Sequence, residues 1–446
     1  MNVAFEISPL ITASGTFGDK SGVYRYMIGL LESYIQYSLK KDKDSNIVLF
    51  SFNRDLMKYP LNPDVIKLAE HPQVTILNKI PTITQRSLLE SIRATIIMDV
   101  PVLRSVLKIF NKLLSITKIS HELENRINFH VYYNFLNKQF KKKHVKVVFH
   151  SDTGFFNMIG YKNVITIYDL TGVAMTYLHR DETVDLQRRK MRFARLYCDG
   201  IVCISKSTKK DLFNFSPMFR EKKTIVCYPG LDKSFTKIYE SSNDSFERIK
   251  KMLSTKKFNL EKKKYFLYYG TFEPRKNLLY LIRAFCDLVD EGKIPSDFKL
   301  VMAGGRGWGR VKNMITQYIT ENYQTDEEKN VIVLNYVKDE GIIDFIQNAT
   351  CVVYPSLYEG FGLPVLESMS QGTPVICSNT SSLPEAGGHA VLYVNPHDFF
   401  DLKNKMQLLV TDHHLSKELS VKGIDQAKKF TWEKSAKLLY EFFQGL

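Results

Sequence analysis

Two glutamates, Glu359 and Glu367, are separated by seven residues, among them two glycines and a proline. The apolar run before them ends like a buried strand, and Pro364 stands where a helix would begin. Glycines let a backbone approach a ligand closely, and the unpaired N–H groups at a helix start attract phosphate. The alternative is ordinary surface charge, but the flanking elements favour a phosphate-binding loop. The predicted loop comprises Gly360, Phe361, Gly362 and Leu363.

Two adjacent cations, Arg275 and Lys276, follow a second apolar run, residues 265–269. Ligands of open α/β sheets bind beyond the carboxyl ends of the strands, which is where this pair would lie. Helix starts normally favour acidic side chains, so two cations at such a position indicate an anionic ligand rather than surface charge. A guanidinium fork beside an ammonium point charge suits a diphosphate.

The elements that would position these residues follow from alternating strand and helix patterns along the whole chain. Such alternation predicts an α/β protein with parallel, doubly wound sheets. We predict a Rossmann-like domain over residues 1–240, a linker near 239–263 and a second such domain over 258–428. Asn277 and Asp339 are predicted helix caps. The predicted strands span residues 3–7, 47–50, 74–77, 145–149, 164–167, 200–204, 224–227, 265–269, 299–303, 331–334, 351–354 and 374–377.

Charge is distributed unevenly between the two halves. The formal net charge is +15, and residues 1–230 hold 34 Lys and Arg against 20 Asp and Glu. Residues 100–119 form a predicted amphipathic helix with a basic stripe. This helix could lie on an anionic membrane, or it could pack on the protein core and expose its basic face to solvent. No signal peptide or long apolar span occurs in the sequence, so we expect a cytoplasmic protein, with peripheral contact to the inner face of the membrane as a possibility.

Three other patterns are given structural interpretations. Asp42-Lys43-Asp44 resembles a metal-binding acidic triplet, but it lies in a hydrophilic run and is interpreted as a solvated loop. The glycine-rich residues 304–309 lack the G-x-G-x-x-G spacing and are interpreted as a turn near the ligand. The six cysteines show no C-x-x-C spacing, so neither a zinc site nor a disulfide framework is predicted. No metal and no cofactor are expected.

These motifs together resemble the retaining glycosyltransferases with two facing Rossmann domains, the GT-B type of family 4, which include bacterial mannosyltransferases of polysaccharide biosynthesis. The resemblance rests on Glu359, Glu367 and the Arg275-Lys276 pair. Supporting segments are residues 21–26, 166–170 and 378–385. It implies a metal-independent transfer of a hexose, with GDP-mannose as the best guess for the donor, to a glycan or lipid-linked acceptor with retention of configuration.

The family pattern also implies a role for individual residues. Gly22 resembles the glycine that admits the nucleotide phosphates, and Glu367 the acceptor for ribose hydroxyls. Glu359, with Tyr168 and Asp169, would hold the reacting sugar. Tyr336 and Val337 would form the base-binding loop. The final helix, within residues 429–446, would pack back on the first domain.

One position departs from that pattern. Many members carry His-Asp where this chain has Tyr168-Asp169. A tyrosine hydroxyl can donate a hydrogen bond but cannot act as a base near neutral pH. His150 is a candidate replacement, although a structural histidine is the more common reading.

Two other classes of function are considered. One is a different enzyme on the same fold, an epimerase or a phosphorylase. The other is a non-catalytic module that binds anionic membrane surfaces. Nucleic acid is not expected as a partner.

Overall fold

The computed structural model describes residues 1–12, 22–53, 56–58, 61–77, 119–236, 243–253, 260–305, 307–322 and 330–446. Within these ranges, no helix has the length and apolar character needed to cross a lipid bilayer. Residues 100–118, most of the predicted basic amphipathic helix, lie outside the described residues.

The first half of the chain forms a parallel sheet with the strand order β3-β2-β1-β4-β5-β6-β7 in the described residues. The predicted strands recur with ends shifted by one or two residues, because apolar side chains extend beyond the ladder hydrogen bonds. Alternate residues of β1 face opposite layers: Val3 and Phe5 pack in the same cluster as α2, and Ala4 packs with α6. The strands are β1 Val3–Glu6, β2 Ile47–Phe50, β3 Val74–Ile76, β4 Val147–His150, β5 Lys162–Ile167, β6 Gly200–Cys203 and β7 Lys223–Val226.

The second half forms another parallel sheet, with the order β10-β9-β8-β11-β12-β13. Its central strands are buried on both faces, as expected for a sheet covered by helices on each side. The edge strand β13 was not predicted. The strands are β8 Tyr265–Tyr269, β9 Lys299–Ala303, β10 Val331–Leu334, β11 Cys351–Tyr354, β12 Val375–Ser378 and β13 Leu392–Val394.

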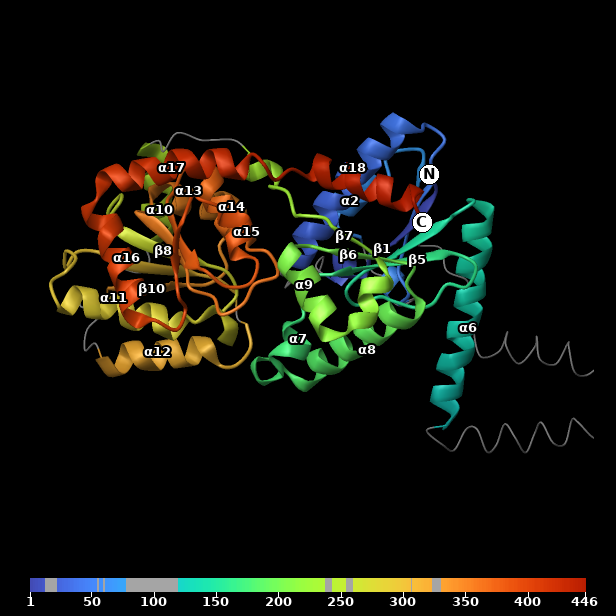
Figure 1. Ribbon diagram of the computed structural model, residues 1–446, viewed down its shortest axis with the longest axis horizontal. Helices are drawn as coiled ribbons and strands as arrows, with labels where there is room; N and C mark the ends of the chain where they lie inside the picture. The colour runs from blue at the N-terminus through green and yellow to red at the C-terminus, as the bar shows by residue number, and fades with distance from the viewer. Residues whose placement is uncertain are drawn as a thin grey trace, which may run out of the picture.

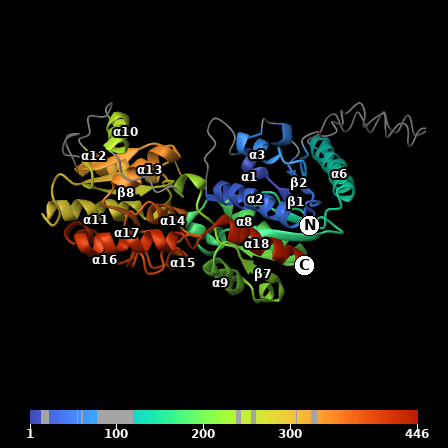
Figure 2. The ribbon, with the colours of Figure 1, turned by 90° about the horizontal axis from the view of Figure 1, so that it is seen from above.

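Helices cover both faces of each sheet, and the two domains lie side by side (Figures 1 and 2). The helices of the first half are α1 Ser8–Thr12, α2 Gly22–Lys41, α3 Pro63–Leu68, α6 Ile119–Lys142, α7 Thr171–Ala174, α8 Asp181–Tyr197 and α9 Lys206–Phe215. Those of the second half are α10 Asn243–Leu253, α11 Leu278–Asp290, α12 Val311–Asn322, α13 Asp339–Asn348, α14 Leu363–Ser370, α15 Leu383–Gly387, α16 Phe399–Thr411 and α17 His413–Ala427. Short 3-10 turns span Leu56–Lys58, Thr176–Leu178, Pro217–Glu221, Lys233–Phe235 and Pro274–Lys276.

The last helix, α18 Trp432–Gln444, returns from the second domain and packs against α2 of the first (Figure 1). Its amphipathic pattern buries Leu439 and Phe443, and the Phe443 ring packs against Phe5 and Tyr34 of the first domain. Gly29 of α2 lets Trp432 approach, since a Cβ there would lie 2.3 Å from the indole. Two facing Rossmann-like domains with a helix crossing back are therefore confirmed.

Three local predictions differ from the structure in detail. Asn277 occupies the position before α11, but its side chain does not cap the helix; it has φ 60° and donates a hydrogen bond to the Pro396 carbonyl. Asp339 is the first residue of α13 rather than its cap, which is Lys338. The predicted linker contains α10, an amphipathic helix that packs on α13 and is tied to it by the Arg248–Asp344 ion pair.

Candidate functional site

A cavity of about 620 Å³ lies between the two domains, at the carboxyl edges of their sheets. Both domains contribute to its wall, from the start of α2 to the first turns of α14. Every residue predicted as catalytic or donor-binding lines this cavity. These residues are Gly22, Tyr168, Asp169, Arg275, Lys276, Tyr336, Val337, Glu359, Gly360, Phe361, Gly362, Leu363 and Glu367.

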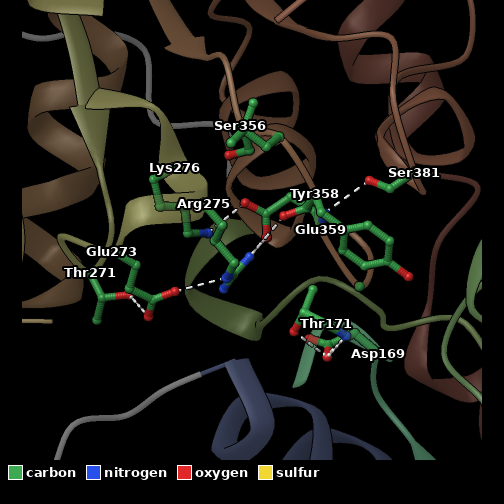
Figure 3. A network of polar contacts seen from close by, with 12 residues as sticks. Asp169, Thr171, Thr271, Glu273, Arg275, Lys276, Ser356, Tyr358, Glu359 and Ser381 are labelled. Atoms are coloured by element: carbon green, nitrogen blue, oxygen red, sulfur yellow. Dashed lines mark hydrogen bonds and ion pairs between the residues drawn. The ribbon is translucent and has the colours of Figure 1, made fainter. Parts of the chain in front are cut away.

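The two predicted phosphate-binding cations are engaged by carboxylates (Figure 3). Arg275 places Nη1 2.7 Å from Glu359 Oε2 and Nε 2.8 Å from Glu273 Oε2. Lys276 donates to Glu359 Oε1 at 2.6 Å and to the Tyr354 hydroxyl at 3.0 Å. The sequence predicted the two cations and Glu359 but not their pairing. Any anionic ligand of Arg275 and Lys276 would have to compete with Glu359 for both cations.

Burial and charge oppose each other at this cluster. Burial alone would raise the pKa of Glu359, but Arg275 and Lys276 hold it at about 2. Burial and the neighbouring Arg275 lower the pKa of Lys276. Charged groups held in a buried network of this kind occur often at functional sites.

The backbone of the predicted phosphate-binding loop, residues 360–363, can approach a ligand closely. Gly362 has φ 102° and precedes α14 without a side-chain cap. Pro364 has no N–H, and Val365 and Leu366 donate to the Gly362 carbonyl, so the backbone N–H groups of residues 360–363, which line the cavity, are the candidate donors to a phosphate. Gly360 contacts the first domain, because a Cβ there would lie 2.5 Å from the Tyr168 carbonyl oxygen. At Gly22 a Cβ would meet nothing within 4 Å, which leaves room for a ligand.

Glu367 is almost fully buried and bonds to both domains. Its Oε1 accepts from Arg25 Nη1 at 2.5 Å, and its Oε2 accepts from the Tyr269 hydroxyl at 3.1 Å. Burial raises the pKa of Glu367, and Arg25 opposes that effect. Tyr336 and Val337 lie in the loop before α13 and border the same part of the cavity.

Tyr168 and Asp169 follow β5 on the opposite wall. Asp169 accepts hydrogen bonds from the backbone N–H and the hydroxyl of Thr171, at 3.0 and 2.8 Å. The Tyr168 ring packs edge-on against Tyr26 at 5.4 Å, and the ammonium of Lys190 lies 5.2 Å from its centroid.

His150 is not a replacement for the missing imidazole. It is fully buried, Nε2 bonds to Asn163 Oδ1 at 2.9 Å, and burial lowers its pKa to about 4. It does not line the cavity.

Several lining residues were not predicted. Arg25 lies three residues after Gly22, where the α2 pattern indicated only a helix start. Trp308 donates from Nε1 to the Leu178 carbonyl at 2.6 Å, which joins the glycine-rich turn to the first domain. Glu273 could have been found as an acidic residue beside Arg275. Further unpredicted wall residues are Arg180, Thr183, Tyr269 and Asp339.

The domains also meet beside the cavity. The Glu385 carboxylate, from α15 of the second domain, accepts from the backbone N–H groups of Lys206 and Ser207 at 2.8 and 2.6 Å. These groups begin α9 of the first domain, so a carboxylate caps a helix across the interface. Tyr228 donates to the same carboxylate at 2.8 Å.

The acidic triplet at residues 42–44 is a surface turn. Asp42 accepts from the Met1 amino group at 2.6 Å and from the Asp44 backbone at 3.0 Å. No group of three or more His, Cys, Asp or Glu side chains in the described residues is arranged to hold a metal ion.

Comparison with known proteins places this cleft in context. Residues 250–430 match the family described as "Glycosyl transferases group 1". An O-antigen chain mannosyltransferase B from Escherichia coli is 38% identical over 177 residues, which cover 40% of this chain and 45% of that protein. A serotype-specific mannosyltransferase WbdA from the same species is 29% identical over 248 residues, 56% of this chain and 29% of that protein. The chain thus spans less than half the length of these curated relatives.

Solved structures match the whole chain. Sucrose-phosphate synthase from Thermosynechococcus elongatus superposes with a TM-score of 0.65 at 18% identity, covering 100% of this chain and 98% of that one. Anabaena Alr3699/HepE in complex with UDP and glucose gives a TM-score of 0.60 at 13% identity, covering 100% and 99%. Such identities establish the fold alone. The chain therefore carries a group 1 glycosyltransferase domain at residues 250–430 within a two-domain GT-B fold, and its resemblance to bacterial mannosyltransferases of polysaccharide biosynthesis is confirmed.

Proposed function

We propose that this protein transfers a hexose from a nucleoside-diphosphate sugar, with GDP-mannose as the leading donor, to a glycan or lipid-linked acceptor. The observation that carries the proposal is the convergence of all the predicted donor and catalytic residues on one cavity between the domains. Two relatives, an O-antigen chain mannosyltransferase B and a serotype-specific mannosyltransferase WbdA, support mannose as the sugar.

The proposed chemistry is mainly electrostatic. Breaking the bond between the anomeric carbon and the diphosphate develops positive charge on the sugar and negative charge on the leaving group. Arg275, Lys276 and the N–H groups before α14 would stabilise the departing diphosphate. Glu359 and Asp169 would lie near the sugar, and the leaving diphosphate would help to deprotonate the acceptor, with retention of configuration.

A nucleotide panel tests the donor site. Purified protein is heated with GDP, UDP, dTDP or ADP in the presence of EDTA. A ligand at about 100 times its dissociation constant stabilises the folded state by about 2.7 kcal/mol. We expect one nucleotide, GDP first, to raise the melting temperature of the wild type and not that of the Arg275→Ala/Lys276→Ala variant.

A matched control separates binding from general damage. Lys403 is also a buried lysine paired with carboxylates, Asp287 and Glu291, but it lies outside the cavity. Lys403→Ala should lose intrinsic stability and still respond to the nucleotide. Stabilisation that requires added Mg²⁺ would contradict metal independence, and the lack of response to every nucleotide would refute the proposed function. Release of GDP from GDP-mannose then tests the sugar.

A further inference from the structure

Arg25 reaches across the cavity from one domain to the other. It lies in the first turn of α2, and its guanidinium contacts two carboxylates of the second domain. Nη1 is 2.5 Å from Glu367 Oε1, and Nη2 is 2.6 Å from Asp339 Oδ1. Arg25 therefore contacts the second domain at Glu367, the carboxylate that the family resemblance assigns to the ribose hydroxyls of the donor.

The ionised form of Glu367 is destabilised by burial. Only 3% of its side chain is exposed, and isolated buried carboxylates become neutral. The titratable groups that face it are Arg25 from α2, Tyr269 from β8 and Asp339 from α13. Arg25 is the cation among them, and the nearby Asp339 acts in the opposite direction.

The protonation state of Glu367 decides what it can bind. An ionised carboxylate has about four acceptor positions, and here Arg25 and Tyr269 occupy one position on each oxygen. The remaining positions can accept the two hydroxyls of a ribose. A protonated Glu367 would turn one oxygen into a donor and lose acceptor capacity.

We propose that Arg25 is a donor-site positioning residue supplied across the cleft, whose guanidinium holds Glu367 in the carboxylate form that accepts the ribose hydroxyls of a nucleoside diphosphate. The inference rests on the proposed function and deepens it. Because the cation and the carboxylate belong to different domains, the ribose site is complete only when the two domains are in contact.

The test is the pH dependence of nucleotide binding by Arg25→Gln. Removing an opposite charge at this distance raises the pKa of a carboxyl by about one to three units. Dissociation constants of GDP, or of the nucleotide that stabilises the wild type, are measured by calorimetry from pH 5.5 to 8.5. The dissociation constant of the variant is divided by that of the wild type at each pH, so that titration of the nucleotide phosphate cancels from the ratio. We expect this ratio to be larger at pH 5.5 than at pH 8.5, by about tenfold for each unit by which the pKa of Glu367 in the variant lies above pH 5.5.

Three further variants make the result specific. Arg25→Lys keeps the charge and should show a ratio independent of pH. Adding Glu367→Gln to Arg25→Gln removes the titrating group, so the pH dependence should disappear. Arg248→Gln removes a bidentate ion pair with Asp344 away from the cavity and should leave binding unchanged at every pH.

The possible outcomes are distinguishable. A ratio that is large but equal at all pH values would mean that Arg25 contacts the nucleotide directly. A ratio of one would mean that Arg25 only links the two domains. Either result overturns the inference and leaves the proposed function intact. If the wild type binds no nucleoside diphosphate, both fail. If Arg25→Gln does not fold, a pH-dependent loss of affinity in Arg25→Lys would also overturn the inference.

Discussion

Glu6 offers a quantitative test of how the first domain joins the segments at the carboxyl edge of its sheet. It ends β1, is fully buried, and accepts hydrogen bonds from the hydroxyls of Ser8 and Ser151 and from the Phe52 backbone N–H. Its carboxyl group thereby joins the segments that follow β1, β2 and β4. Gly154 makes room for it, since a Cβ at that position would lie 2.2 Å from the carboxyl carbon.

The size of the pH-dependent contribution of Glu6 to the free energy of unfolding follows from its pKa. Burial raises the pKa of Glu6 from 4.5 to about 7, with the hydroxyl hydrogen bonds offsetting part of the rise. A pKa difference of about 2.5, at about 1.4 kcal/mol for each pKa unit, corresponds to about 3.5 kcal/mol, of which about 3 kcal/mol is lost between pH 4.5 and pH 8. The folded state holds its proton more tightly than the unfolded state, so this contribution is fully present below pH 4.5. It is lost as the pH rises to about 7.

Glu6→Gln should remove that dependence, because an amide does not titrate. Unfolding in urea at pH 4.5 and pH 8 gives the difference in unfolding free energy between variant and wild type at each pH. We expect this difference to shift by about 3 kcal/mol in favour of the variant at pH 8. The same change at the exposed Glu221 serves as the control. A difference for Glu6→Gln that is the same at both pH values within about 0.5 kcal/mol would refute the reasoning.

Two further predictions concern the cavity. Gly22→Ala should leave the melting temperature unchanged, since the added Cβ meets no atom within 4 Å. It should nevertheless weaken nucleotide binding in a titration if the phosphates pass close to the Gly22 backbone. An unchanged affinity would show that Gly22 is not part of the donor site. Glu359→Gln leaves Arg275 and Lys276 without their shared carboxylate, which should cost about 3–5 kcal/mol of unfolding free energy. A bound diphosphate should restore more stability to this variant than to the wild type in a thermal melt, and an equal gain in both proteins would show that the diphosphate does not contact these cations.

The fold could be predicted from the sequence because its signals are local. Apolar runs of four or five residues followed by amphipathic helices specify βαβ units, and parallel sheets bring the ends of successive strands to one edge. That rule alone placed Arg275 and Glu359 at the same cavity. The strand β13 was not predicted because it has only three residues. Leu392 and Tyr393 are half-buried, so its apolar pattern is weak.

Contacts between the domains could not be predicted in the same way. Arg25 and Glu367 are 342 positions apart, and Ser207 and Glu385 are 178 apart. Each residue alone is compatible with an exposed helix start, which is the common place for a charged side chain. These residues become partners only through the relative placement of the two sheets. Aromatic packing of α18 on the first domain contributes to that placement from a distant part of the sequence.

The charges that line the cavity change how donor binding should be understood. Among the described lining residues, four cations face five carboxylates, so the diphosphate does not enter a ready-made positive pocket. Arg275 and Lys276 already bind Glu359, and Arg25 already binds Glu367 and Asp339. A diphosphate must therefore take over cations that carboxylates now hold. Its affinity then depends on how readily Glu359 gives up Arg275 and Lys276, and for this reason the Glu359→Gln variant should bind diphosphate more tightly even though it folds less stably.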